Sequence, residues 1–474
     1  MKRVVVIGGG IAGLAAAHRI LELAQEKDLA IDLTLLEASE RLGGSIATER
    51  IGSFLVEAGP DSFITEKPWA LRLCERLRLT DRLYSTQPAY QKIYVVNGGK
   101  LVSLPEGFFL LAPTRFWPFL HSPLFSWRGK LRMGAEIFLP RSKNHQDESL
   151  GSFVRRRFGA EALERVAQPL VGGIYAANPD QLSLTATMPR FKEMERSRGS
   201  IIRAMWSEQK RRAHGKSGSG ARWSLFVTLA DGMQELVEAI RQRIPKNAIR
   251  LNASVTELTR DVKKQSWCIA VGHDEPITAD TVIIAAPAFA AAQILAPVAN
   301  GAAAELLKIP YASTATVSLA YRRQDFPRPP DSFGFVVPAV EQRKIMACTF
   351  SSLKYPGRAP EDHILLRAFV GGALQPELFA DDNATMTKNV RAELEGLLGV
   401  VAEPVFIRVW RHPKSMPQYY TGHGDRMERI GTTLHQFPSL ALAGSGYYGV
   451  GISDCVRTGE EAAERIVTFL TSNV

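Results

Sequence analysis

The sequence has little of what marks several common classes of protein. Its 474 residues contain four cysteines without a CxxC pair, so we predict neither a disulfide framework nor a zinc site, and a reducing compartment fits. No uninterrupted apolar run reaches the roughly 20 residues that span a bilayer. The nine histidines are dispersed. Because no Ser-His-Asp set, carboxylate pair or metal-spaced cluster stands out, we predict no metal site and no side-chain acid or base.

The bulk composition is that of an ordinary globular protein with room for two or three lobes. Hydrophobic residues make up 45% and charged residues 22% of the chain, values at which disorder is not expected. The formal charge of +10 is compatible with nucleic acid, a membrane surface or an anionic small molecule, and a total charge cannot choose among them. Met1-Lys2-Arg3 runs directly into apolar residues instead of the regions of a signal peptide, so we expect a cytoplasmic protein.

The first 37 residues have the order strand, glycine turn, helix, strand. Apolar residues at 4–7 and 31–36 predict two buried strands, and residues 11 to about 25 predict the helix between them. Gly8-x-Gly10-x-x-Gly13 fills the turn, where the helix amides can bind a pyrophosphate, and Glu37 can accept a ribose hydroxyl. We therefore predict a dinucleotide site that contains Gly8, Gly9, Gly10, Ile11, Ala12, Gly13, Glu37 and Ala38.

Further glycines follow this unit and occur again near the C-terminus. Gly43-Gly44 and Gly59-Pro60 suit a ligand that extends past the pyrophosphate. Four glycines from Gly444 to Gly451 precede a predicted helix from about 453 to 470, whose N-terminal amides can stabilise negative charge. This pattern resembles the GG-doublet flavoproteins, the amine oxidase, desaturase and protoporphyrinogen oxidase superfamily. The resemblance implies non-covalent FAD and adds to its site Arg41, Gly43, Gly44, Ser45, Gly59, Pro60, Asp61, Ser62, Gly444, Val450, Gly451 and Ile452.

Four longer segments carry a closer resemblance. They are residues 168–176 (QPLVGGIYA) followed by Leu182-Ser183-Leu184, residues 365–372 (LLRAFVGG), Pro417-Gln418-Tyr419 before Gly422-His423, and residues 447–451 (YYGVG). They resemble the oxygen-dependent protoporphyrinogen and coproporphyrinogen oxidases of heme biosynthesis, over nearly the whole chain. The resemblance implies that flavin N5 takes a hydride from a porphyrinogen and that dioxygen reoxidises the flavin to yield hydrogen peroxide. A chelatase is a candidate recipient of the product, and nucleic acid is not an expected partner.

The expected fold is α/β. It has a Rossmann-like GG-doublet FAD-binding domain, an antiparallel-sheet substrate lobe and a helical lobe with a candidate membrane-facing surface. Alternating residues between 317 and 370 predict the antiparallel sheet, and strands are predicted at 249–255, 281–286 and 440–443. We place the FAD-binding domain at residues 1–66, 223–290 and 405–474, the substrate-binding lobe at 67–90 and 291–404, and the helical lobe at 91–222.

The implied substrate suggests a second set of residues. A porphyrinogen is an apolar macrocycle with anionic propionates at its rim, so its site needs an apolar slot with basic groups at the mouth. Ile174 and Phe369 are candidates for the slot walls, and Lys67 and Lys92 for propionate contacts. Each of these residues also fits an ordinary core or surface position. Which basic side chains converge stays open, and so does the choice between coproporphyrinogen and protoporphyrinogen.

Two more residues are assigned to the cofactor. The family pattern places Val255 beside the adenine, although a buried strand valine is an equally good explanation. Trp410 precedes the closing glycine segment and is a candidate for packing on the flavin, while burial alone also explains it. His412 and His423 are interpreted as structural.

Residues 108–139 interleave Phe, Trp and Leu with basic residues. This mixture favours an interfacial position on anionic lipids, which the corresponding lobe takes in mitochondrial and plastid members of the family. An apolar wall of the substrate channel explains it as well. We keep peripheral contact with the inner face of a membrane as one of the two interpretations. The basic residues are Arg115, Arg128, Lys130 and Arg132.

Two other functions stay open from the sequence. An amine oxidase or a carotenoid-type desaturase has the same fold, and the lack of cysteine between 445 and 451 excludes only the enzymes that tether FAD there. A non-enzymatic relative, such as a prenyl-GTPase escort protein, keeps the nucleotide fold without a flavin. Such a protein would be colourless after purification.

Overall fold

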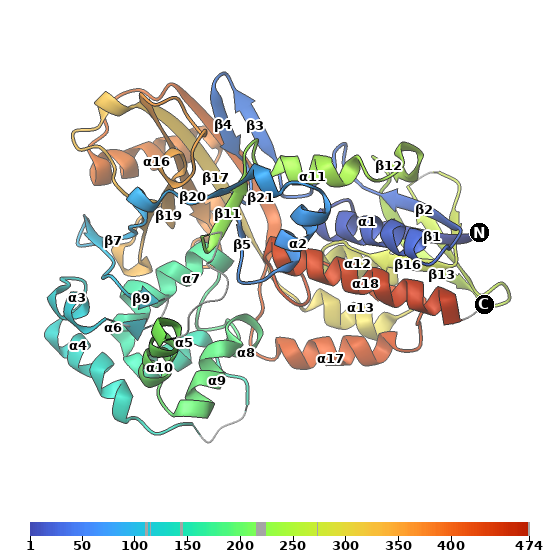
Figure 1. Cartoon of the computed structure of the whole chain (residues 1–474), viewed down its shortest axis with the longest axis horizontal. Coiled ribbons are helices and arrows are strands. Elements are labelled where there is room, and N and C mark those ends of the chain that lie inside the picture. Colours follow the sequence, from blue (N-terminus) through green and yellow to red (C-terminus); the bar gives the residue numbers. More distant parts are fainter. Residues whose placement is uncertain (110–111, 114, 143–145, 215–223, 273, 473–474) are drawn as a thin grey trace.

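The computed structural model describes residues 1–109, 112–113, 115–142, 146–214, 224–272 and 274–472. They form a parallel sheet flanked by helices near both termini, a broad and mostly antiparallel sheet, and a separate group of helices (Figure 1). The mixed α/β fold predicted from the sequence is confirmed.

A five-stranded parallel sheet forms the first region. Its strand order is β12-β2-β1-β16-β22, so strands from distant parts of the chain are neighbours. Alternate residues of β1 enter different cores: Val4 and Val6 lie in one, Val5 and Ile7 in the other. Because both faces are buried, the strand is continuously apolar. The strands are β1 (Lys2–Ile7), β2 (Ile31–Leu36), β12 (Ile249–Arg250), β16 (Thr281–Ile284) and β22 (Leu440–Leu442).

Helices cover both faces of this sheet. On one face α1 (Ile11–Glu26) and α18 (Ile452–Ser472) lie side by side (Figure 1). A Cβ at Gly459 would be 2.2 Å from the carbonyl oxygen of Ala12, so this close approach requires glycine. The helices predicted at 11–25 and 453–470 are thus confirmed to within about two residues. The same core includes α11 (Gln234–Arg241), and the opposite core includes α12 (Ala288–Leu295) and α13 (Asn300–Leu307).

The strand predicted at 249–255 is wrong. β12 ends at Arg250, and Asn252 has a φ of 54°, in the left-handed region that ends an extended strand. A new strand, β13, then starts at Val255 and pairs with β14 in a separate three-stranded sheet. The alternation of polar and apolar residues at 249–255 therefore continues past the end of β12. The pattern alone could not show that the strand ends there.

The second region is a seven-stranded sheet. Its order is β21-β17-β20-β19-β18-β7-β8, and its pairs are antiparallel except β18 with β7. The antiparallel sheet predicted between 317 and 370 is confirmed, and it extends further than predicted. The strands are β7 (Tyr94–Asn97), β8 (Lys100–Ser103), β17 (Tyr311–Arg322), β18 (Gly334–Val336), β19 (Ala347–Phe350), β20 (His363–Gly371) and β21 (Phe406–Pro417).

The expected domain boundaries stay a prediction. Three strands from segments assigned to other domains nevertheless belong to the seven-stranded sheet. β21 falls after the boundary at 405 and still forms an edge of the seven-stranded sheet, where it pairs with β17. β7 and β8, from the segment assigned to the helical lobe, form the opposite edge. Edge strands are added by pairing with one neighbour, so segments from either side of a domain boundary can complete the same sheet.

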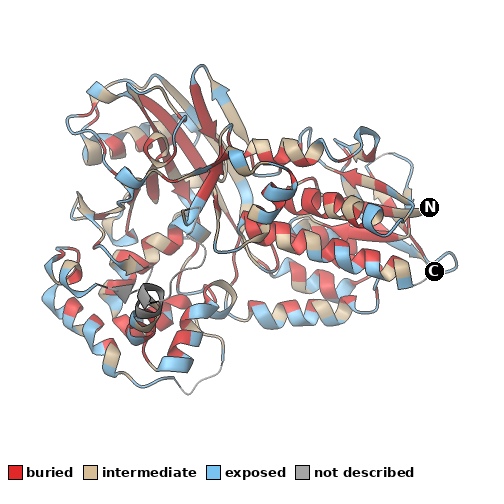
Figure 2. Ribbon diagram, in the orientation of Figure 1, coloured by how far each residue is buried: buried red, intermediate tan, exposed pale blue. Residues whose placement is uncertain are grey.

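The third region gathers helices from the middle of the chain, with their apolar faces turned inward (Figure 2). The polar stretch at 142–148 lies partly outside the described residues, and so does the stretch at 209–222, whose first residues continue α10. The helices are α3 (Phe116–His121), α4 (Trp127–Gly134), α5 (Leu150–Phe158), α6 (Ala160–Ala162), α7 (Gln168–Tyr175), α8 (Leu184–Thr187), α9 (Pro189–Arg198) and α10 (Ile201–His214).

The remaining elements pack on these three regions or connect them. In the described chain, no helix combines the length and the apolar character needed to cross a membrane. The remaining strands are β3 (Thr48–Ile51), β4 (Phe54–Glu57), β5 (Phe63–Ile64), β6 (Leu83–Ser85), β9 (Phe108–Phe109), β10 (Ala112–Pro113), β11 (Phe226–Leu229), β13 (Val255–Asp261), β14 (Ser266–Val271) and β15 (Ile277–Ala279). The remaining helices are α2 (Trp69–Arg76), α14 (Ser351–Lys354), α15 (Pro376–Ala380), α16 (Asn383–Leu398) and α17 (His423–Leu434).

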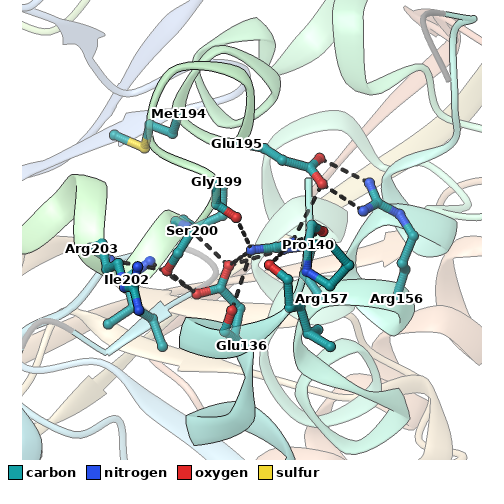
Figure 3. A network of polar contacts seen from close by, with 12 residues as sticks. Glu136, Pro140, Arg156, Arg157, Met194, Glu195, Gly199, Ser200, Ile202 and Arg203 are labelled. Carbon is teal, nitrogen blue, oxygen red and sulfur yellow. Dashed lines mark hydrogen bonds and ion pairs between the residues drawn. The ribbon is translucent and has the colours of Figure 1, made fainter. Parts of the chain in front are cut away.

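A buried ionic network holds the helical region together (Figure 3). Arg157 and Glu136 have fully buried side chains, and the arginine Nε donates to the carboxylate at 2.9 Å. Glu136 also accepts the hydroxyl of Ser200 at 2.6 Å and backbone N–H groups at the start of α10, where negative charge is favourable. Glu195 accepts two bonds from Arg156 at 2.6 and 2.9 Å. The network therefore links α5, α9 and α10 through an ion pair that has no access to water, Arg157 with Glu136, and a partly exposed one, Arg156 with Glu195.

We predict that Arg157→Met destabilises the protein by about 3–5 kcal/mol, because it leaves the buried Glu136 carboxylate without its cation. The matched control is Arg155→Met on the same helix, whose pair with Asp180 is about half exposed; it should cost less than about 1 kcal/mol. Urea unfolding followed by circular dichroism measures both variants. Equal effects would show that burial of the ion pair is unimportant.

Candidate functional site

The first glycine turn is built for close approach of a ligand. Gly8 has a φ of 108°, and a Cβ there would lie 2.5 Å from the carbonyl oxygen of Ala285. A Cβ at Gly13 would lie 1.9 Å from the carbonyl oxygen of Gly8, so helix and strand meet only through glycine. At Gly10, in contrast, no described atom lies within 4 Å of such a Cβ. The open side of the turn is therefore next to Gly10, at the N-terminus of α1.

The start of α1 is suited to an anion. Among the described residues, no side chain caps its N-terminus and no acid occupies its first turn. The first N–H groups of a helix lack intrahelical acceptors and carry partial positive charge. An open space beside them fits a pyrophosphate.

Glu37 lies beside the glycine turn, and its contact with a ribose stays a prediction. It follows β2, and one carboxylate oxygen accepts the N–H of Gly9 at 2.6 Å. The other oxygen accepts the N–H and hydroxyl of Ser39 at 2.8 and 2.7 Å. The acid is thus held at the edge of the glycine turn by three hydrogen bonds.

The second glycine pair packs directly on the first turn. The N–H of Gly43 donates to the carbonyl of Gly9 at 2.8 Å, and Gly43 and Gly44 have φ values of 106° and 58°. A Cβ at Gly59 would lie 1.9 Å from the carbonyl oxygen of Ser45, which brings the segment after β4 onto this loop. Three segments predicted to contact the cofactor, at 8–13, 41–45 and 59–62, therefore form one continuous surface.

Arg41 has a role that the sequence did not suggest. Its guanidinium donates to the carbonyls of Leu42, Gly44 and Ile46 at 3.2, 2.5 and 2.9 Å. These bonds fix the shape of the glycine loop from within. Arg41 stays a predicted cofactor residue, and its observed partners are in its own loop.

The closing segment near the C-terminus returns to the same place. It connects β22 to α18, and a Cβ at Gly444 would lie 3.8 Å from the Cβ of Ala12 in the first turn of α1. The N–H of Gly444 donates to the hydroxyl of Thr458 at 3.0 Å. Gly444 and Gly449 have φ values of 119° and 133°, which favour glycine. The two ends of the chain thus converge at the start of α1, as predicted.

Asp61 is engaged by two largely buried cations. Its carboxylate lies 3.0 Å from the ammonium of Lys354 and 3.1 Å from the guanidinium of Arg367. Burial opposes ionisation of Asp61, but Lys354 and then Arg367 more than offset it and hold the pKa of the carboxyl well below its usual range. Arg367 also donates to the carbonyl of Gly59 at 2.6 Å. This cluster attaches the 59–62 segment to the seven-stranded sheet.

Sequence reasoning missed both cations. Arg367 lies in the segment LLRAFVGG at 365–372, where an arginine between apolar strand residues was the available signal of a buried charge. Lys354 follows no comparable pattern. Its partner Asp61 is 293 positions away in the sequence, so the pair depends on the tertiary fold.

The predicted substrate residues fall in different places. Lys67 pairs with the buried Asp454 at 2.6 Å, in the first turn of α18, which puts its ammonium beside the closing segment. Lys92 instead pairs with Asp331 at 3.0 Å, and both side chains are more than half exposed. The structure therefore links Lys67, and not Lys92, to the predicted cofactor site. Asp454 was missed, because nothing in the sequence relates it to Lys67.

The two apolar candidates, Phe369 and Ile174, also lie in different surroundings. Phe369 lies on β20 opposite Thr316 and Ala347, and the guanidinium of Arg367 lies 4.9 Å from the centre of its ring. It thus belongs to the sheet face that carries the Asp61 cluster. Ile174 lies on α7 and is 45% exposed, so it is not an ordinary core residue.

Val255 and Trp410 both have apolar neighbours. Val255 begins β13 and packs on the core that contains Val5 and Ile7. Trp410 lies on β21, partly buried against the cluster that contains Phe54 on β4. These contacts account for both residues without a ligand, and their contacts with the cofactor stay predictions.

The interpretation of His412 as a structural residue agrees with its contacts. Its Nε2 lies 2.9 Å from the carbonyl oxygen of Ala58, and burial lowers the pKa of the ring below its usual value. A carbonyl only accepts, so Nε2 carries the proton and the ring is neutral. Among the described residues there is also no group of three or more side chains that could hold a metal ion.

The sequence is similar to those of known flavin-containing enzymes. The sequence model of a family described as flavin containing amine oxidoreductase matches residues 11–467. A coproporphyrinogen III oxidase of Bacillus subtilis (strain 168) is 35% identical over 99% of this chain and 99% of its own. Protoporphyrinogen oxidase 2, chloroplastic/mitochondrial, of Arabidopsis thaliana is 27% identical over 99% of this chain and 95% of its own.

Solved structures show the same fold. A crystal structure of a protein from Exiguobacterium sp. 255-15 superposes with a TM-score of 0.86 at 32% identity, covering 99% of both chains. Cyclohexylamine oxidase from Brevibacterium oxydans superposes with a TM-score of 0.71 at 17% identity, again over 99% of both chains. At that identity the second likeness concerns the fold alone.

We predict that Gly10→Val weakens the binding of a dinucleotide while leaving the fold intact. The new side chain enters open space, so the free energy of unfolding of the ligand-free protein should change by less than about 0.5 kcal/mol. The same space is where we expect the pyrophosphate, so affinity for added FAD should fall about tenfold or more. Fluorescence titration measures the affinity. Gly173→Val, also with no described atom within 4 Å, is the control and should bind FAD normally.

Proposed function

The chain belongs to the flavin containing amine oxidoreductase family, and from this membership we propose that it is an FAD-dependent oxidase that converts a porphyrinogen to the porphyrin in heme biosynthesis. The observation that carries the proposal is the 35% identity to a coproporphyrinogen III oxidase over 99% of both chains. Similarity along the full length includes the glycine segments at 8–13, 43–44 and 444–451, which we call the glycine cradle, and the sheet face with Phe369.

The family is one of flavin-containing oxidoreductases, and FAD is the flavin that we propose. A dinucleotide fits the open turn at Gly10, the carboxylate of Glu37 and the glycine loop at Gly43-Gly44. The closing segment contains no cysteine between 445 and 451, in keeping with non-covalent binding there. When bound, the flavin would supply the hydride acceptor, and dioxygen would restore it with release of hydrogen peroxide.

The protein's own part in the reaction is to bind the substrate and to orient it. Phe369 and Ile174 supply apolar surface for a macrocycle, and Lys67 supplies a cation beside the closing segment. Lys67 is about half exposed and its partner Asp454 is buried, so the ammonium can reach a substrate carboxylate while it keeps its own counter-ion. Lys92 is a weaker candidate, because its exposed pair with Asp331 lies apart from these groups.

Coproporphyrinogen III is the substrate that we favour. Three coproporphyrinogen III oxidases are 32–35% identical to this chain, whereas the plant protoporphyrinogen oxidases are 27–29% identical. The difference in identity favours the first substrate over the second. Handover of the product to a chelatase stays a prediction.

Contact with an anionic membrane surface also stays a prediction. Two of the four basic residues on which it was based are engaged within the protein. Lys130 donates to the carbonyl of Leu120, and Arg132 donates to carbonyls of α5, so neither is free to meet lipid. Arg115 and Arg128 are exposed. Sedimentation with phosphatidylglycerol vesicles tests the contact, and the absence of co-sedimentation at low salt would exclude it. The exposed apolar residues of this region are Phe116, Trp117, Trp127, Leu131 and Phe138.

The proposed activity is tested by anaerobic reduction of the bound flavin. We predict that coproporphyrinogen III bleaches the flavin faster than protoporphyrinogen IX and that cyclohexylamine leaves it oxidised. Admission of oxygen should restore the colour and yield hydrogen peroxide, measured by stopped-flow absorbance and a peroxidase-coupled assay. Bleaching by neither porphyrinogen would reject the proposal, and bleaching by the amine would favour an amine oxidase.

The same assay tests the role of Lys67. We predict that Lys67→Gln raises KM for coproporphyrinogen III about tenfold with little change in kcat, because a contact made equally before and during the reaction affects binding alone. Lys92→Gln is the control and should change KM less than about twofold, since its pair is exposed. Equal effects of the two variants would contradict the assignment.

A further inference from the structure

The segment PQY at 417–419 and the pair Gly422-His423 have no role in the proposed function. In the structure, Tyr419 follows the end of β21 and His423 begins α17. Both side chains are only 2% exposed. Their rings stack with centroids 4.0 Å apart and planes 13° apart. The two residues therefore form one rigid unit, packed against the closing segment between β22 and α18.

The hydroxyl of Tyr419 joins two points of the closing segment. It donates to the carbonyl oxygen of Ser445 at 2.5 Å and accepts the N–H of Gly449 at 2.8 Å. Burial raises the pKa of this phenol well above its usual value, so it keeps the proton that it donates. A single side chain thus fixes the distance across residues 445–449.

His423 holds the middle of the same segment. Its Nε2 lies 2.8 Å from the carbonyl oxygen of Tyr447. Because a carbonyl only accepts, Nε2 carries the hydrogen. Burial lowers the pKa of the ring, Arg426 lowers it further, and Asp147 acts in the opposite direction. The ring is therefore neutral, and its Nδ1 has no hydrogen-bond partner in the described part of the chain.

The closing segment needs such external support. Gly444 and Gly449 have positive φ values, and glycine loses more conformational freedom on ordering than any other residue. The bonds from Tyr419 and His423 reach Ser445, Tyr447 and Gly449, which alternate along the segment. A second tyrosine, Tyr447, donates to the carbonyl of Ala286 at 3.2 Å. The segment is thus held in place by hydrogen bonds that involve three side chains, those of Tyr419, His423 and Tyr447.

We propose that Tyr419 and His423 are positioning residues for the flavin. They hold residues 445–449 in the conformation that closes on the cofactor and thereby set its affinity and its reduction potential. This inference rests on the proposed FAD site. Neither residue needs to touch the substrate or to exchange a proton.

The test uses Tyr419→Phe, which keeps the ring and its stack on His423 and removes the hydroxyl. The carbonyl of Ser445 and the N–H of Gly449 then lose a buried partner. We expect the dissociation constant of FAD to rise about tenfold, with a shift in the midpoint potential of the bound flavin and in its visible absorption band. His423→Phe keeps the stack and loses the bond to Tyr447, so it should act in the same direction.

The control is Tyr321→Phe, which removes a hydroxyl from a tyrosine that is 1% exposed in the core of the seven-stranded sheet. It should leave affinity, potential and spectrum unchanged. If Tyr419→Phe and His423→Phe lower the unfolding midpoint as the control does but leave those three properties at wild-type values, the inference is overturned. Should Tyr419→Phe fail to fold, His423→Phe alone decides in the same way. A wild-type protein that binds no FAD would overturn the proposed function instead.

Discussion

The close approach of α1 and α18 is the interaction on which the rest of the site depends. Gly459 lets one helix touch the backbone of the other at Ala12, and no larger residue fits that contact. This contact fixes the closing segment above the first turn of α1. The glycines at 8–13, 43–44 and 444–449 can therefore face one ligand although more than 400 residues separate the first from the last. Without the helix contact, each glycine segment would be an unrelated turn.

A second constraint joins this cradle to the seven-stranded sheet. Asp61, Lys354 and Arg367 form a largely buried cluster with one negative and two positive charges, and Arg367 also binds the carbonyl of Gly59. Moving Asp61 away from such a cluster leaves two cations without their counter-ion, so the cluster resists separation of the two regions. The sheet face with Phe369 is thereby held at a fixed place relative to the glycine loop. Orientation of a large substrate against a cofactor requires this kind of rigid connection.

Local features of the site could be predicted from the sequence, whereas its long-range pairs could not. The βαβ unit and the closing helix follow from hydrophobic period, glycine spacing and an acid after the second strand, all of which act within a few residues. The pairing of Lys67 with Asp454 spans 387 positions and that of Lys354 with Asp61 spans 293. No local pattern encodes such contacts. The strand predicted at 249–255 failed for a related reason, since a left-handed Asn252 turns the chain without a change in polarity.

The order of strands in the parallel sheet also has a consequence for how the protein is made. β22 and α18 are synthesised well after β1, α1 and β16, and they complete both the sheet and the helix pair that begins at Ile11. Contacts of such large sequence separation form late and slowly. The nascent chain therefore exposes an unfinished sheet edge beside β16 until β22 has been synthesised. Because the closing segment connects β22 to α18, the proposed cofactor site stays incomplete until both elements have been synthesised.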